Sequence, residues 1–353
     1  MKPPPRLVRR LVVAPLVGLL EVVLLILSPL LLLVAALLSP FFGGWRPVRL
    51  LSIGLVYAWR HVTAMVACLW LWLRGGFGRR FGEEDLVDAH YGVMRWFVDG
   101  IYRAVVRIAH VHVDVRDSEA EEARVTEGER PVLVLGRHAG AGDSLLIIYE
   151  LLCRERRRPR VVMKDLLRWD PLIDMLGERL PNRFVDPRGG DIEHEIATMA
   201  GELDARAALI IFPEGGNFTA ERRVRSIERL EEAGHDDEAA KARSMRNVMA
   251  PRPGGSIAAI AAAPDADVVI VGHVGFPPSF SHIWRMLLPD EQSVELREWV
   301  YDASDLPASF DDRIDWLFEH WLELDAWVGE RLAAEDGPRV DAALLEAETE
   351  PAS

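Results

Sequence analysis

The chain has 353 residues and a net charge of −14; half of its residues are hydrophobic and 27% are charged. This composition excludes a disordered chain and a polytopic transporter, and the length suits one large domain with an appendage. Two Cys residues exclude a disulfide scaffold. The first 80 residues hold ten Lys or Arg and one acid, Glu21, so the rest of the chain is acidic. An acidic body argues against nucleic acid as a partner, and a basic, apolar head favours a membrane surface.

Residues 1–80 are predicted to be an N-terminal membrane anchor of one or two hydrophobic helices. The run 22–38 is nearly long enough to cross a bilayer, and Pro29 predicts a kink or a re-entrant hairpin there. A second apolar run, 50–73, is interrupted by Arg60 and His61, so three arrangements stay open: it lies in the interface, packs on the first run or spans the bilayer. The alternative is a signal peptide, but two apolar runs without a cleavage site disfavour it. Basic residues before the first run and after the second predict that both ends face the cytoplasm.

Residues 81–334 are predicted to form an α/β domain. An amphipathic helix is expected at 85–109, followed by short β-rich runs that alternate with helical stretches. Strands are expected at 111–115, 131–135, 160–163, 183–186, 208–212, 268–274 and 294–300, and helices at 143–156, 168–180, 190–205, 219–245, 254–263 and 309–334. This alternation predicts a mostly parallel sheet flanked by helices, with ligands bound at the carboxyl ends of its strands. The acidic segment 335–353 is predicted to be a mobile tail.

A glycine-rich turn follows the expected strand at 131–135 and carries His138 and Asp143, five residues apart. Gly140 and Gly142 permit the positive φ angles of a tight return, so the carboxylate can fold back to the imidazole. A histidine held by a carboxylate has a fixed tautomer and a stabilised imidazolium, which favours a general base. The alternative is a turn histidine beside an aspartate that only caps a helix.

A second acid ends the strand expected at 208–212. The sequence there is Phe212-Pro213-Glu214-Gly215, which places a carboxylate at the carboxyl end of a buried strand. Such an acid is poised to receive a hydroxyl or a cation; the alternative is an acid that only caps the strand end.

Together the two motifs resemble those of the glycerolipid acyltransferases, in particular the 1-acylglycerol-3-phosphate (lysophosphatidic acid) acyltransferases. Lys164 and Arg183-Phe184-Val185-Asp186 resemble the substrate-binding segment of that family. The resemblance covers residues 110–300, and an apolar N-terminal anchor also fits it.

The chain departs from the family pattern at three places. Arg137 stands where the family usually has Asn, Arg188 comes one place later than the usual arginine, and Gly215-Gly216-Asn217 replaces Gly-Thr-Arg. The usual phosphate-binding arginines are therefore displaced or missing, which leaves the acceptor open. Residues 247–255 resemble a Pro-Arg loop found in a subset of lysophospholipid acyltransferases, and this implies a phosphate contact for Arg252. A solvated loop arginine is the alternative.

The resemblance implies transfer of an acyl group from acyl-CoA or acyl carrier protein to the hydroxyl of a lysophospholipid, in the first place 1-acylglycerol-3-phosphate. It implies that His138 is the general base and that Asp143 orients it. The implied substrate contacts are Glu214, Gly215, Lys164, Arg183, Arg188 and Arg252. A thioester is already activated, so the reaction needs an oriented nucleophile and no metal or redox cofactor. The expected location is a membrane, with the catalytic domain facing the cytoplasm.

Other functions compete with this interpretation. Gly142-Asp143-Ser144-Leu145 spells the motif of the GDSL esterases, in which the serine is the nucleophile, and Asp191 and His194 offer an Asp-x-x-His pair. In that family the pair lies near the end of the catalytic domain, whereas several expected strands follow it here. A binding role with an inactive site is disfavoured because both motifs are intact. Another lysophospholipid or a glycolipid remains the alternative acceptor.

Overall fold

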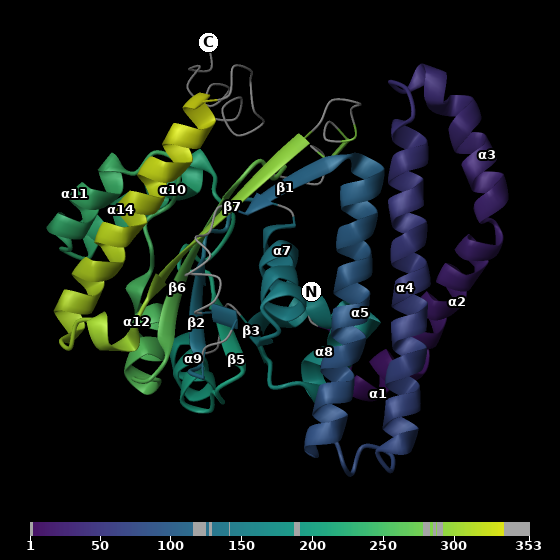
Figure 1. The fold of residues 1–353 in the computed structure, drawn as a ribbon, viewed down its shortest axis with the longest axis horizontal. Helices are drawn as coiled ribbons and strands as arrows, with labels where there is room; N and C mark the ends of the chain where they lie inside the picture. The colour runs from purple at the N-terminus through teal and green to yellow at the C-terminus, as the bar shows by residue number, and fades with distance from the viewer. Residues whose placement is uncertain are drawn as a thin grey trace.

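A computed structural model describes residues 3–115, 125–126, 129–140, 142–186, 191–277, 283–284, 287 and 292–334. Arg188 and the predicted tail 335–353 lie outside the described residues. In the described part of the chain, a seven-stranded sheet forms the centre of the body, and helices cover both of its faces (Figure 1).

The sheet has the strand order β1-β7-β6-β2-β5-β3-β4. Strands β2 to β6 run parallel to one another, whereas β7 pairs antiparallel with β6 and parallel with β1. The predicted fold class, a mostly parallel α/β sheet, is therefore confirmed. The strands are β1 Val111–Val115, β2 Val132–Gly136, β3 Arg158–Lys164, β4 Arg183–Val185, β5 Ala207–Ile211, β6 Asp267–Val274 and β7 Gln292–Tyr301.

The neighbouring strands β2 and β5 are buried along their whole length. Their continuous apolar sequences are typical of parallel strands covered on both faces. One face packs under α9, α11, α12 and α14, and the other under α5 and α7. These helices are α5 Glu84–Ala109, α7 Asp143–Tyr149, α9 Ile192–Gly201, α11 Asp236–Ser244, α12 Pro253–Ala262 and α14 Phe310–Ala334. Because β2 and β5 are neighbours, the turns that follow them meet at one edge of the sheet.

Two predicted helices differ from the structure. The helix expected at 219–245 is two helices, α10 Ala220–Glu232 and α11, because Gly234 adopts a φ of +77° that a right-handed helix does not allow. The helix expected at 168–180 starts later, as α8 Pro171–Arg179. Asp170 caps it by accepting a hydrogen bond from the Ile173 N–H at 2.8 Å.

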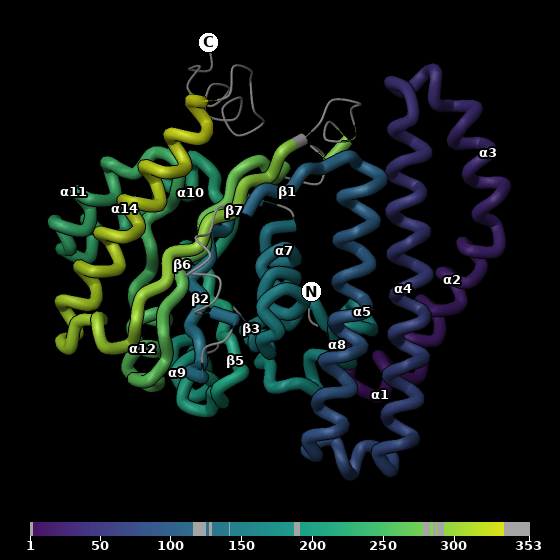
Figure 2. Tube along the Cα trace, in the orientation of Figure 1, coloured from purple at the N-terminus to yellow at the C-terminus, as the bar shows by residue number. Residues whose placement is uncertain are grey.

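The apolar N-terminal segment forms helices that stand against α5 (Figures 1 and 2). Helices α4 and α5 lie side by side, and α2 and α3 contact α4. The bend expected near Pro29 is present: the axis turns by 62° where α2 ends and α3 begins. The helices are α1 Arg6–Val8, α2 Ala14–Ile26, α3 Ser28–Leu38 and α4 Arg46–Arg74. Among the described residues, α4 alone is long and apolar enough to cross a membrane, and the bent pair Arg6–Ile26 and Ser28–Phe41 passes the same test only together.

The first basic residues in the described part of the chain bind the α/β body. Arg9 is buried, and its Nη2 lies 3.0 Å from both Asp174 Oδ1 and Glu178 Oε1 on α8. Because Asp174 is 1% exposed, the pair is shielded from solvent and holds the helical turn Arg9–Val13, which follows α1, against α8.

The polar residues in the middle of α4 also face inward. The Arg60 guanidinium lies 4.2 Å from the ring centroid of Trp96 on α5. His61 is buried between Glu21, at 2.8 Å, and Asp170, at 3.2 Å. The two residues that interrupt the second apolar run are therefore satisfied by the protein itself.

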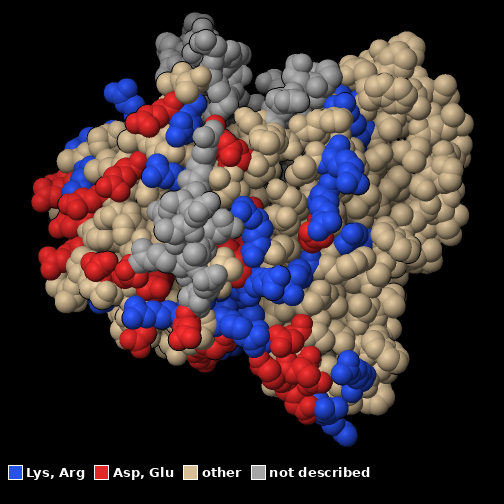
Figure 3. Space-filling view, viewed as in Figure 1, with Lys and Arg blue, Asp and Glu red and all other residues tan. Residues whose placement is uncertain are grey.

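The outward faces of α2, α3 and α4 are apolar. Figure 3 shows this side as an almost unbroken tan surface, whereas acidic residues gather on the opposite side of the molecule. Large apolar side chains are well exposed there, among them Leu19, Leu30, Leu37, Trp59 and Trp70. An apolar surface of this extent marks an interaction site.

Candidate active site

The turn after β2 brings His138 and Asp143 together. Gly142, with a φ of +110°, returns the chain so that α7 begins at Asp143. The Nδ1 atom of His138 lies 2.8 Å from Asp143 Oδ2. The imidazole is partly open to solvent, with 21% of the side chain exposed, and it packs on Phe212 with ring centroids 4.6 Å apart. The pair thus sits at the carboxyl edge of the sheet with one ring nitrogen available to a ligand.

Asp143 is more than a helix cap. Its Oδ2 also accepts hydrogen bonds from the backbone N–H groups of Ala139, at 3.0 Å, and Gly140, at 3.1 Å. Burial alone would raise the pKa of Asp143, but the His138 hydrogen bond and the Gly140 N–H help to lower it to about 2. The carboxylate is therefore ionised at any physiological pH, and it fixes His138 with a proton on Nδ1 and a free lone pair on Nε2.

Glu214 holds the backbone of His138. One carboxylate oxygen accepts the His138 backbone N–H at 3.0 Å, and the other accepts the Met249 N–H at 3.2 Å. The His138 carbonyl accepts the Phe218 N–H at 2.9 Å, so residues 214–218 hold the histidine backbone on both sides. Glu214 is 3% exposed, and the structure places its carboxylate on the backbone rather than free for an acceptor hydroxyl. The substrate contact expected of Glu214 stays a prediction.

Burial sets the ionisation of Glu214. It raises the pKa of this carboxyl to about 7, against the opposing effects of Arg137, the two backbone N–H groups and His138. Glu214 is therefore poised to change charge near neutral pH.

Arg137, the residue that departs from the family pattern, is part of the protein interior. It is 2% exposed; its guanidinium donates to the carbonyl of His273 and, at 3.0 Å, to that of Asn247. His273 Nε2 lies 3.0 Å from the Arg137 carbonyl. Burial and the charge on Arg137 lower the pKa of His273 to about 4, so His273 is neutral at neutral pH. Sequence reasoning missed this pair; the signal available was a histidine inside an apolar strand.

Residues 112–274 match the family model described as Acyltransferase, and this segment contains both motifs. This part of the chain is similar to the acyltransferase family. The match confirms the family resemblance that the two motifs predict.

A solved structure is also similar to this chain. It is the crystal structure of the 1-acyl-sn-glycerophosphate (LPA) acyltransferase PlsC from Thermotoga maritima. The similarity covers 79% of this chain and 100% of that chain, with 15% identity and a TM-score of 0.48. No curated protein matches the chain.

The other predicted substrate contacts lie on different strands of the sheet. Lys164 ends β3, two strands away from β2, and is exposed. Arg183 begins β4, and its Nε lies 3.6 Å from a carboxylate oxygen of Glu195. Among the described residues, neither contacts His138, and Arg188 lies outside them.

Arg252, by contrast, packs against the turn that holds His138. A Cβ added to Gly215 would lie 3.0 Å from the Arg252 Cζ, so this guanidinium packs directly on the glycine. Arg222 packs on Gly216 in the same way, because a Cβ added to Gly216 would lie 2.5 Å from the Arg222 Nη1. Burial and the nearby charges of Arg229 and Arg222 lower the pKa of Arg252.

The guanidinium groups of Arg252, Arg222 and Arg229 have no acidic partner among the described residues. Two guanidinium groups thus pack on the Gly215-Gly216 turn, and the charge of Arg229 is close enough to act on Arg252. An anion bound there relieves their mutual repulsion.

The residues that the esterase hypothesis requires, Ser144 on one side and the pair Asp191 and His194 on the other, do not come together in the described structure. The Ser144 hydroxyl donates to Asp143 Oδ1 at 3.1 Å. Asp191 caps α9 by accepting the His194 N–H at 3.0 Å. Neither residue of this Asp-x-x-His pair contacts Ser144 in the described structure, so the described residues do not form the triad that a GDSL esterase needs.

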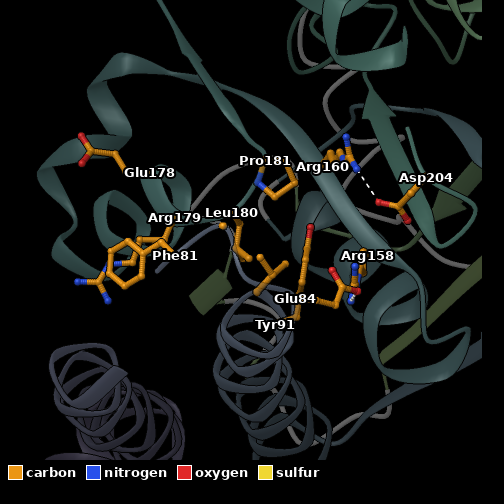
Figure 4. A pocket seen from close by; sticks show the side chains of 12 residues that line it. Phe81, Glu84, Tyr91, Arg158, Arg160, Glu178, Arg179, Leu180, Pro181 and Asp204 are labelled. Atoms are coloured by element: carbon orange, nitrogen blue, oxygen red, sulfur yellow. Dashed lines mark hydrogen bonds and ion pairs between the residues drawn. The ribbon is translucent and has the colours of Figure 1, made fainter. Parts of the chain in front are cut away.

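A pocket of about 410 Å³ lies elsewhere, where β3 and β5 begin (Figure 4). Two of its arginines pair with acids: Arg158 lies 2.6 Å from Glu84, and Arg160 lies 2.7 Å from Asp204. The third, Arg179, donates to the Cys68 carbonyl at 2.6 Å. Because His138 follows the carboxyl end of β2, this pocket is on the opposite edge of the sheet. We assign no step of acyl transfer to it.

Proposed function

We propose that the protein transfers a fatty acyl group from acyl-CoA or acyl carrier protein to the hydroxyl of a lysophospholipid. The leading acceptor is 1-acylglycerol-3-phosphate, which gives phosphatidic acid. The observation that carries the proposal is the His138–Asp143 pair at the carboxyl edge of β2, inside the segment that matches the acyltransferase family model.

His138 and Asp143 supply the chemistry. Nε2 of His138 takes the proton of the acceptor hydroxyl while that oxygen attacks the thioester carbonyl carbon. Asp143 stabilises the imidazolium that forms, because its carboxylate stays ionised. When the C–S bond breaks, the imidazolium returns the proton to the leaving thiolate. An ester and a free thiol result, without a covalent enzyme intermediate.

The acceptor phosphate is proposed to bind at Arg252 and Arg222. These side chains pack against the turn that holds His138 and lack acidic partners among the described residues. They stand in for the arginine that Asn217 replaces in the family motif. Lys164 and Arg183 are less suited, since the first lies two strands away and the second pairs with Glu195.

A lysolipid panel tests the proposal. Long-chain acyl-CoA and acyl carrier protein are offered with 1-acylglycerol-3-phosphate, a zwitterionic lysophospholipid, a monoacylglycerol and a glycolipid. We expect the phosphomonoester to be the best acceptor. A higher rate with the glycolipid or the zwitterionic lipid would favour the alternative acceptor, which the missing family arginine leaves open.

The variants Arg252→Gln and Arg222→Gln test the phosphate contact. Each is expected to raise KM for 1-acylglycerol-3-phosphate by about 10- to 100-fold, the range of about 1.5–3 kcal/mol for a hydrogen bond to a charged group. The rate with monoacylglycerol should hardly change, because that acceptor has no phosphate. Arg225→Gln is the matched control, since Arg225 lies on the same helix and pairs with Glu221. An equal loss with both acceptors would contradict a phosphate site.

The apolar faces of α2, α3 and α4 are proposed to bind the membrane, with the body on the cytoplasmic side. The test is vesicle flotation of the full chain and of the triple variant Leu19→Glu, Leu30→Glu, Leu37→Glu, whose side chains are exposed. Burying one leucine is worth about 1.5–3 kcal/mol, so the partition coefficient should fall by more than about 10²-fold. Phe310→Glu, an exposed residue of α14, is the control and should float normally. Unchanged flotation of the triple variant would rule out this face.

A further inference from the structure

The loop between α11 and α12 is held by a carboxylate of the C-terminal helix. Asp325 on α14 accepts three consecutive backbone N–H groups on one oxygen: Arg246 at 2.9 Å, Asn247 at 2.5 Å and Val248 at 3.0 Å. Asp325 is 8% exposed, so these bonds are largely shielded from water. The loop conformation therefore depends on one side chain that lies far along the sequence.

A second residue of α14 holds the same loop. Trp321 is one helical turn before Asp325 and is fully buried, and its Nε1–H donates to the Met249 carbonyl at 3.1 Å. Gly329 allows the close approach, because a Cβ there would lie 2.9 Å from the Asn247 side-chain nitrogen. One face of α14 thus fixes residues 246–249.

The loop continues directly to the acyl-transfer site. The next N–H in the series, that of Met249, donates to Glu214, and the other oxygen of Glu214 accepts the His138 N–H. Four consecutive backbone N–H groups are thus shared between two buried carboxylates, Asp325 on one side and Glu214 on the other. The loop is a short, fully hydrogen-bonded bridge between α14 and the histidine.

We infer that Asp325 and Trp321 are positioning residues for acyl transfer: through loop 246–249 they fix Glu214, and through Glu214 the backbone of His138. This inference rests on the proposed role of His138 as general base. Both residues lie outside the segment 112–274 that matches the family, so the family motifs assign them no part in the reaction.

The bridge also acts on the charge of Glu214. The charged and titratable groups that act on this carboxyl are Arg137 and His138, and the Met249 N–H joins them in lowering its pKa against the effect of burial. If the loop moves away, the pKa of Glu214 rises further above its value of about 7. More Glu214 is then protonated at neutral pH, so activity that needs its carboxylate is retained at high pH and lost sooner as the pH falls.

The test uses Asp325→Asn and Trp321→Phe in the full chain, with melting temperature and the pH dependence of kcat as readouts. We expect kcat at neutral pH to fall by about 10- to 100-fold, the scale of a catalytic group displaced by about 1 Å, with the acceptor KM nearly unchanged. The acid limb of the kcat profile should move to higher pH. Asp315→Asn is the matched control, because Asp315 is exposed on the same helix and pairs only with Lys241 at 2.6 Å; its profile should equal that of the wild type.

The inference is wrong if Asp325→Asn lowers the melting temperature but keeps the wild-type kcat and pH profile. If Asp325→Asn does not fold, Trp321→Phe decides by the same criteria, because it removes one hydrogen bond and keeps an aromatic ring in place. His138→Ala, assayed in parallel, separates the two hypotheses. An active His138→Ala overturns the proposed mechanism, whereas an inactive His138→Ala beside normal α14 variants overturns this inference alone.

Discussion

Replacing His138 with alanine is expected to lower kcat/KM for acyl transfer by about 10²- to 10⁴-fold, the usual contribution of a general base. The ring can accept a proton from a ligand through the lone pair on Nε2, because Nδ1 is hydrogen-bonded to Asp143 at 2.8 Å. The ring is not deeply buried, so the variant should fold, and its KM for the acceptor should change little. Single-turnover assays with long-chain acyl-CoA and 1-acylglycerol-3-phosphate measure the chemical step directly.

Ser144→Ala is the control for this experiment, because it removes the nucleophile of the esterase hypothesis. It deletes one hydrogen bond to Asp143 and leaves four others, including that of His138, so we expect a loss below about 10-fold. The opposite pattern would overturn the proposal. Thioester or lipid hydrolysis abolished by Ser144→Ala and spared by His138→Ala would assign the protein to the esterases.

Asp143→Asn is expected to have the second-largest effect, a fall in kcat of about 10²- to 10⁴-fold, as expected when a base loses its orienting carboxylate. The amide is neutral and cannot stabilise the imidazolium. It can also present an N–H to His138 Nδ1, which would place the histidine proton on Nε2 and remove the lone pair that accepts the hydroxyl proton. Asp191→Asn, the same change at the start of α9 away from the site, should keep full activity. A fully active Asp143→Asn would show that the pair is structural.

The same carboxylate should make stability depend on pH at the acid end. The pKa of Asp143 falls from an ordinary 3.8 to about 2 on folding. The lowered pKa contributes about 2 kcal/mol to the free energy of unfolding. That contribution is fully present above pH 4 and is lost as the pH falls through about 2. Urea unfolding of wild type and Asp143→Asn should therefore differ by more at pH 6 than at pH 2; an equal difference at both values would contradict the lowered pKa.

Much of the fold and half of the site could be predicted from local sequence. The apolar runs of β2 and β5 predict buried parallel strands because each covers a whole strand without a polar residue. His138 and Asp143 could be paired in advance because they are five residues apart on a glycine turn, and a turn of that length has few ways to close. The apolar N-terminal segment could also be predicted, because hydrophobicity is a property of each residue and needs no tertiary contact.

The tertiary structure decided which groups those residues meet. Glu214 and Met249, or Asp325 and Asn247, are far apart in the chain, so only the packing of α14 and the loop on the sheet brings them to hydrogen-bond distance. Packing also determines the partners of a motif side chain. The two carboxylate oxygens of the buried Glu214 accept backbone N–H groups, which the sequence motif does not predict. Packing likewise favours Arg252 over Lys164 and Arg183 for the proposed phosphate contact. Of these three side chains, that of Arg252 packs against the turn that holds His138.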